Sequence, residues 1–148
     1  MKRKIFYGFG ALVTVAIISV AYYAIAPLFR NIKIYESAPV TQGTVTNVAI
    51  PVIGTTGHPA SGTVRVVHGE DASYLRYEDF KTINGPDLYV YLSTDLEAKD
   101  FVSLGRLRAT EGNVNYEIPV GIDTEKYRYA LVWCKAFGVL FNHADISN

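Results

Sequence analysis

The chain has 148 residues and a mass of 16.4 kDa, which suits one ordinary domain with a short extension. Hydrophobic residues make up 49% and charged residues 19%, a composition that excludes intrinsic disorder as the main state. The formal net charge is zero, but residues 31–148 carry 10 basic and 14 acidic side chains, so this part has a net charge of −4. We therefore expect no nucleic-acid partner. The single cysteine, Cys134, excludes an internal disulfide and any two-cysteine redox or zinc motif.

The N-terminal segment predicts a membrane anchor. Residues 5–29 contain no charged side chain and follow a basic tail, residues 1–4. About 20 helical residues cross the hydrocarbon core of a bilayer, which is roughly 30 Å thick. Basic residues favour the cytoplasmic side. We expect an uncleaved transmembrane signal anchor at residues 5–29 that has the lipid bilayer as its partner. The protein would then be a single-pass protein of the cell membrane, with its N-terminus cytoplasmic and the rest extracytoplasmic.

A cleaved signal peptide is the alternative interpretation of the same segment. The apolar stretch of a signal peptide usually has roughly 7–15 residues, fewer than the run found here. Residues 24–26 read Ala-Ile-Ala, which resembles a cleavage signal, but Pro27 follows and disfavours cleavage. We favour the uncleaved anchor. Residues 30–43 are mixed in composition and predict a short stalk.

Residues 44–148 predict one all-β domain. Short runs rich in β-branched and aromatic residues alternate with turn signals. The expected strands are residues 44–53, 63–67, 74–80, 88–92, 102–108, 115–118, 127–135 and 137–141. About eight strands in this length indicate an antiparallel β-sandwich or a small barrel. A helical turn is expected at residues 95–100 and a hairpin turn at residues 111–113. A helix over residues 126–141 is the alternative, because short apolar runs are ambiguous.

Cys134 is the candidate site residue, and its role has two interpretations. On a strand, Cys134 shares a face with Ala130 and Val132, whereas Lys135 points to the opposite face. Most free cysteines are small buried hydrophobes. A reactive thiolate needs a nearby cation or a helix N-terminus to lower its pKa, and any such partner must come from another strand.

The three histidines, His58, His68 and His143, offer no ligand pattern for a metal ion. Blue copper is disfavoured because His143 follows Cys134 by nine positions and the only methionine is Met1. The chain has no Cys-x-x-Cys-His sequence for covalent haem. We predict no metal site. A non-covalent haem, held by Cys134 or by a histidine, stays open as a cofactor.

A set of ordered motifs resembles the DM-thirteen domain, an extracytoplasmic module that accompanies DOMON domains in Skeletor-type proteins of animals. The motifs lie at residues 57–64, 74–80, 84–93, 104–107, 112–119 and 132–141, and the last reads Val-Trp-Cys-Lys-Ala-Phe-Gly-Val-Leu-Phe. The likeness covers about residues 44–146. It implies electron transfer through the family's cysteine, as a bare thiol or one associated with haem, and this residue corresponds to Cys134. The chain carries no DOMON domain, so the resemblance implies a separate redox partner.

We therefore expect a membrane-anchored extracytoplasmic domain with an electron-transfer role centred on Cys134. The alternative is a non-catalytic binding or assembly module at the cell surface, in which Cys134 is structural and the partner is a binding protein. No cofactor is identified, and we expect the domain to fold without one. The exposure of Cys134 is the feature that separates the two hypotheses.

Overall fold

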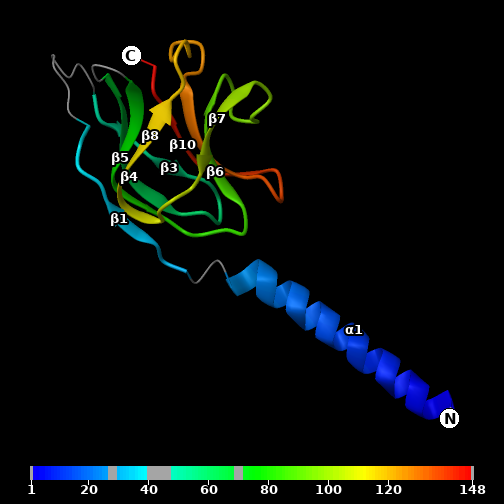
Figure 1. Ribbon diagram of the computed structural model, residues 1–148. Helices are drawn as coiled ribbons and strands as arrows, with labels where there is room; N and C mark the ends of the chain where they lie inside the picture. The colour runs from blue at the N-terminus through cyan, green and yellow to red at the C-terminus, as the bar shows by residue number, and fades with distance from the viewer. Residues whose placement is uncertain (1, 27–29, 40–47, 69–71, 148) are drawn as a thin grey trace.

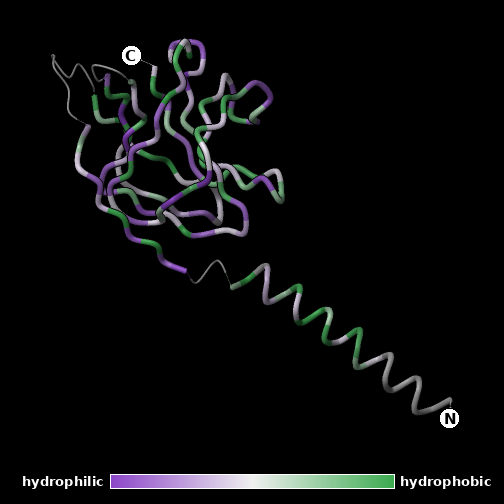
Figure 2. The backbone as a smooth tube through the Cα atoms, in the orientation of Figure 1, coloured by the Kyte–Doolittle hydropathy of each residue, from purple (hydrophilic) through white to green (hydrophobic). Residues whose placement is uncertain are grey.

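The computed structural model describes residues 2–26, 30–39, 48–68 and 72–147, with side chains from residue 10 onward except residue 24. One helix, α1 (Lys2–Ile25), lies outside two β-sheets (Figure 1). Figure 2 shows hydrophobic residues over much of this helix. In the part of the chain that the structure describes, no helix combines the length and apolar character needed to cross a membrane.

Within the described residues, ten strands form two five-stranded sheets that pack face to face (Figure 1). The first sheet has the order β1-β8-β5-β4-β2, with β1 (Lys33–Tyr35), β8 (Glu111–Ile118), β5 (Ser73–Thr82), β4 (Ala60–His68) and β2 (Ile50–Pro51). The second has the order β3-β10-β9-β6-β7, with β3 (Ile53–Gly54), β10 (Val139–Asp145), β9 (Tyr129–Cys134), β6 (Leu88–Ser93) and β7 (Phe101–Arg106). The expected sandwich is confirmed, and the helical alternative for residues 126–141 is wrong.

The core lies between the sheets and follows the two-residue alternation of the strands. Leu88, Val90 and Leu92 of β6 face inward, as the sequence predicts. Leu75 and Tyr77 of β5 meet them from the first sheet, and both are almost fully buried. Two sheets with apolar inner faces bury enough surface for a domain of this size to be stable.

The segment expected as a stalk contributes a strand to the first sheet. Within residues 30–43, β1 pairs with β8, with Lys33 opposite Glu111 and Tyr35 opposite Asn113. This pair is parallel, whereas the other strand pairs of the described residues are antiparallel, so the expected purely antiparallel sandwich is corrected at this edge. A parallel pair needs a long connection, and 75 residues separate Tyr35 from Glu111 in the sequence.

Two local predictions are wrong. Residues 111–113 do not form a hairpin turn, because they begin β8, and β7 and β8 belong to different sheets. Residues 95–100 form bends and a turn instead of a helical turn, since the carboxylate of Asp95 accepts hydrogen bonds from the backbone N–H groups of Glu97 and Lys99. The expected turn at residues 69–71 and most of the expected strand at 44–53 lie outside the described residues.

Candidate functional site

Cys134 ends β9 and faces the core. It lies opposite Leu88 of β6 and Val139 of β10 in the two neighbouring strands. Its side chain is fully buried and belongs to the same apolar cluster as Ala130 and Val132, which confirms the predicted face. The thiol is therefore enclosed by hydrocarbon side chains in the structure.

The cation next to Cys134 in sequence does not reach the thiol. Lys135 lies on the outer face of the sheet, with its Nζ 5.4 Å from the centroid of the Tyr89 ring. The guanidinium of Arg106 lies over the same ring at 5.5 Å. Trp133, which is half-buried, is directly opposite Tyr89 on the neighbouring strand. The outer face beside Cys134 thus combines aromatic rings with cations, whereas the inner face is apolar.

The turn after Cys134 lies at the end of the sandwich where the chain arrives from α1. Residues 135–138 join β9 to β10, and Phe137 in this turn is 65% exposed. The backbone N–H of Lys135 donates to the carbonyl of Asp87 at 2.9 Å. Asp87 lies in the loop between β5 and β6. In that loop, the side-chain amide of Asn84 donates to the carbonyl of Arg30 at 3.2 Å. The loop between β5 and β6 therefore contacts both the end of β9 and Arg30.

The three histidines make contacts of their own that do not include Cys134. His58 stacks on Phe141 with ring centroids 4.0 Å apart, and its Nδ1 lies 3.0 Å from the hydroxyl of Thr55. His68 contacts the hydroxyl of Ser73 near the end of β4, and His143 lies in β10. Among the described residues, no three His, Cys, Asp or Glu side chains lie close enough together to hold a metal ion.

A haem bound through Cys134 does not fit this arrangement. A porphyrin needs a free face next to the ligand atom, but the Cys134 side chain has no exposed surface and is surrounded by packed core residues. A groove of about 560 Å³ is lined by Tyr74, Leu104, Arg106, Arg108 and Tyr116 among others, and Cys134 is not part of its lining.

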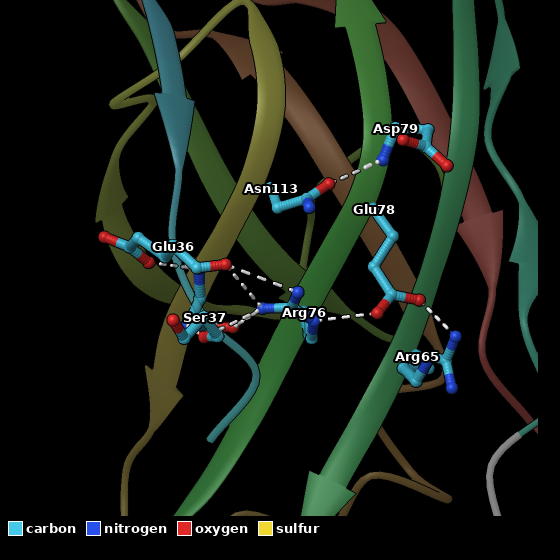
Figure 3. A network of polar contacts seen from close by, with 8 residues as sticks. Glu36, Ser37, Arg65, Arg76, Glu78, Asp79 and Asn113 are labelled. Carbon is cyan, nitrogen blue, oxygen red and sulfur yellow. Dashed lines mark hydrogen bonds and ion pairs between the residues drawn. The ribbon is translucent and has the colours of Figure 1, made fainter.

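Apart from Cys134, the structure contains a polar cluster around Arg76 of β5 that the sequence did not indicate as a site. Arg76 is only 5% exposed although it lies on the outer face of the first sheet. Figure 3 shows its guanidinium between Glu78 on one side and the backbone of Glu36 and Ser37 on the other. Its Nε donates to Glu78 at 2.8 Å, and its Nη1 donates to the carbonyl of Ser37 at 3.1 Å. The side-chain oxygen of Asn115 also accepts from Nη1, at 2.8 Å.

Glu78 connects two arginines of the first sheet. Its carboxylate accepts hydrogen bonds from Arg76 and from Arg65, a pair also drawn in Figure 3. Partial burial by itself raises the pKa of Glu78, but the two arginines outweigh it, so the pKa lies below its ordinary value. The carboxylate therefore stays ionised and holds Arg76 in place. The spacing of Arg76 and Glu78, two positions apart and so on one face of a strand, is the signal that could have indicated this cluster.

Comparison with protein families gives a match for most of the β-sandwich. Residues 53–146, which run from β3 to the end of the described sheets, match the family described as Electron transfer DM13. The chain belongs to this family. The DM13 match begins after β1 and includes Arg76, Glu78 and Cys134. No curated protein and no solved structure gives a significant match to the chain.

Proposed function

We propose that the chain transfers electrons through Cys134. The membership of the Electron transfer DM13 family supports the role, and the position of Cys134 as the only thiol in the chain supports the assignment of the residue. Because the sulfur is fully buried, transfer requires a local opening that exposes it, and the exposed turn at residues 135–138 directly follows the residue.

A single cysteine restricts the chemistry to an exchange with a partner. In the step we propose, the Cys134 thiol loses its proton and its sulfur attacks a disulfide of the partner protein. The S–S bond of the partner breaks, one partner sulfur leaves and takes up a proton, and a mixed disulfide remains. A thiol of a donor molecule then attacks the Cys134 sulfur, which releases the second partner thiol and leaves Cys134 in a disulfide with the donor. A second donor thiol attacks this disulfide and restores the Cys134 thiol. Over the cycle, two electrons pass from two donor thiols to the partner disulfide.

The second candidate function is a non-catalytic binding module, and the full burial of Cys134 favours it. A packed thiol is inert in the folded state because the reactive thiolate is disfavoured in apolar surroundings. The exposed aromatic and cationic side chains beside Tyr89 would then be the part of the domain that meets a partner protein. The two functions differ in one measurable property, the reactivity of Cys134 in the folded chain.

The test uses the full chain in detergent and oxidised glutathione as a small disulfide. Electron transfer predicts that Cys134 gains one glutathione, seen by mass spectrometry, at a rate set by local opening and nearly unchanged by low urea. The unfolded chain in high urea is the positive control. If the rate instead rises with urea as steeply as global unfolding does, the thiol opens only with the whole domain, and the binding module is the better description.

We also propose that residues 5–29 anchor the chain in the bilayer. The proposal rests on the sequence, in which residues 5–29 carry no charge and a basic tail precedes them. The structure does not describe all side chains of this run. The uncharged run extends to residue 29, and α1 contains residues 5–25 of it. Large apolar side chains such as Leu12, Ile17 and Val20 are more than 60% exposed, which suits a helix surrounded by lipid.

Extraction of membranes with alkaline carbonate tests the anchor. We expect the full chain to stay with the membranes and its intact mass to include residues 1–30. The double variant Val13→Arg with Ile17→Arg should be released, because each central arginine costs about 2.5–3.5 kcal/mol on insertion. Tyr22→Arg, near the helix end, is the matched control and should stay bound. A mature N-terminus near Pro27 would show a cleaved signal peptide, and release of the unaltered chain would rule out the anchor.

A further inference from the structure

The outer edge of the first sheet holds an extended segment through a dense set of polar contacts. The segment is residues 32–37, which include β1, and we call it the strap. Its backbone follows β8, and the N–H of Glu36 donates to the carbonyl of Asn113 at 2.9 Å. At its start, Ile32 exchanges hydrogen bonds with Thr110, each 2.9 Å long. These contacts depend on an extended backbone and not on particular strap side chains.

Arg76 and Asn115 donate hydrogen bonds to backbone carbonyls at the C-terminal end of the strap. Arg76 donates to the carbonyls of Glu36 and Ser37 at 3.3 and 3.1 Å. The side-chain amide of Asn115 donates to the carbonyl of Ser37 at 2.9 Å. Figure 3 shows these carbonyls directed at the guanidinium. Arg76 is 5% exposed and divides its donors between Glu78 and Asn115 of the sheet and the carbonyls of the strap, an arrangement that suits an extended backbone.

One side chain of the strap is recognised specifically. The carboxylate of Glu36 accepts from the backbone N–H of Asn115 at 2.7 Å and from Arg108 at 2.6 Å. Charge-assisted hydrogen bonds of this length are stronger than neutral ones. The ion pair between Glu36 and Arg108 and the pair between Lys33 and Glu111 are similarly exposed, and such pairs contribute little. Glu36 differs because its carboxylate also accepts the part-buried backbone N–H of Asn115. The site therefore selects an acidic residue at the position of Glu36 and tolerates change at Lys33.

The strap is a short element at the edge of the sheet, separate from the core strands. Its strand has three residues and lies at the edge of the sheet, with one neighbouring strand. Ile34 is the residue of β1 that packs against the core, whereas Tyr35 is 66% exposed. A segment with little buried apolar surface opens at a lower free energy than the core of its domain.

We propose that Arg76, Arg108 and Asn115 form a recognition site for an extended segment that bears one carboxylate, filled in cis by the strap and able to take the strap of a second copy of this chain. The proposal does not depend on electron transfer or on the membrane anchor. It assigns a binding role to the polar β1–β8 edge of the first sheet, whereas Cys134 lies on the apolar inner face of the second sheet.

A fluorescent peptide of residues 30–38 tests the site. The full chain with its own strap in place should bind the peptide poorly, because a tethered ligand competes at an effective concentration near the millimolar range. The Glu36→Ala chain has a weakened strap and should bind the peptide with measurable affinity. Adding Arg76→Met to that chain should weaken peptide binding by about tenfold or more, since the hydrogen bonds from the guanidinium to the peptide carbonyls are removed.

Peptide variants provide the matched controls. A peptide with Glu36→Ala should bind about tenfold or more weakly, whereas a peptide with Lys33→Ala should bind within about twofold of the original. Amide hydrogen exchange at residue 36 reports whether the strap of the Glu36→Ala chain has opened, and the melting temperature reports whether its sandwich is intact. If that chain stays folded and does not bind the peptide, or if binding ignores Arg76, the proposal is overturned, whether the amide at residue 36 is protected or not.

Discussion

Two large aromatic side chains show how position within the sandwich sets the importance of a residue. Phe80 of β5 is 1% exposed and lies with its ring centroid 4.7 Å from that of Tyr77, inside the core. Trp133 of β9 is half-buried on the outer face. We expect Phe80→Ala to lower the free energy of unfolding by about 3–5 kcal/mol. Trp133→Ala should cost clearly less, because part of its surface is already in water. Urea denaturation of both variants checks the order, and an equal loss would contradict the assigned faces.

The last strand ends in an ion pair that predicts a dependence of stability on pH. Hydrogen bonds from Arg128, helped by Ser147, lower the pKa of Asp145 from 3.8 to about 2. A carboxyl with a lowered pKa in the folded state stabilises the fold above its unfolded pKa, near 3.8, and the stabilisation is lost as pH falls through about 2.

The matched variant for this pair is Asp145→Asn, which removes the charge at nearly constant size. At pH 6 its melting temperature should lie slightly below that of the original chain, because the pair is exposed and screened. Towards pH 2 the two melting temperatures should converge. A difference that persists unchanged at pH 2 would mean that the ionised carboxylate is not its source.

Residue patterns predict the face on which a side chain lies better than they predict its surroundings. The alternation along β9 placed Cys134 with Ala130 and Val132 correctly. Its complete burial depends on Leu88 and Val139, which reach it from two other strands. Arg76 was missed for the same reason: its partners at residues 36, 37 and 115 are about 40 positions away in the sequence. The local spacing of Arg76 and Glu78 indicates only that the two side chains share a face, whereas the other partners of Arg76 come from long-range pairing that no local pattern encodes.

At the scale of whole elements, the long alternating strands were predictable and the short ones were not. The expected strands at residues 63–67, 74–80 and 88–92 correspond to β4, β5 and β6 with shifts of a few residues at their ends. The three-residue β1 is too short to show a period, and it is held by backbone contacts. The glycine at residue 112 suggested a turn, but it serves a close approach between two strands.

This close approach gives a prediction at the level of the β1–β8 pair. Gly112 has a φ of 118°, and a Cβ at this position would collide with the carbonyl oxygen of Ile34. Gly105 of β7 has a φ of 110°, but a Cβ there would meet no atom within 4 Å. Both alanine variants therefore carry backbone strain, and Gly112→Ala alone displaces β1.

Hydrogen exchange separates the two effects. Gly112→Ala should remove the protection of the amide at residue 36, whereas Gly105→Ala should leave this amide protected while lowering the melting temperature. Protection at residue 36 that survives in Gly112→Ala would show that β1 tolerates a shift of its backbone. Loss of protection in both variants would mean that strain in either sheet is enough to release the strap.

For the whole molecule, the sandwich is larger than the family match that defines it. The Electron transfer DM13 match begins at residue 53, yet the first sheet begins with β1 at Lys33. The residues between α1 and the matched region are thus partly inside the folded unit. Arg30 is bound to the sandwich through Asn84, which lies in the loop whose Asp87 accepts the backbone N–H of Lys135.

The capping of β8 by β1 has a consequence for any shortened form of this protein. A fragment that starts at residue 44 would leave the N–H and C=O groups along one side of β8 unpaired, beside an uncovered arginine. Unprotected strand edges pair with other molecules and aggregate. We expect the fragment from residue 44 to elute as dimers and larger aggregates on size exclusion, and a fragment from residue 30 to stay monomeric. A soluble fragment would then have to start near residue 30, fourteen residues before the domain boundary at residue 44 that the sequence suggests.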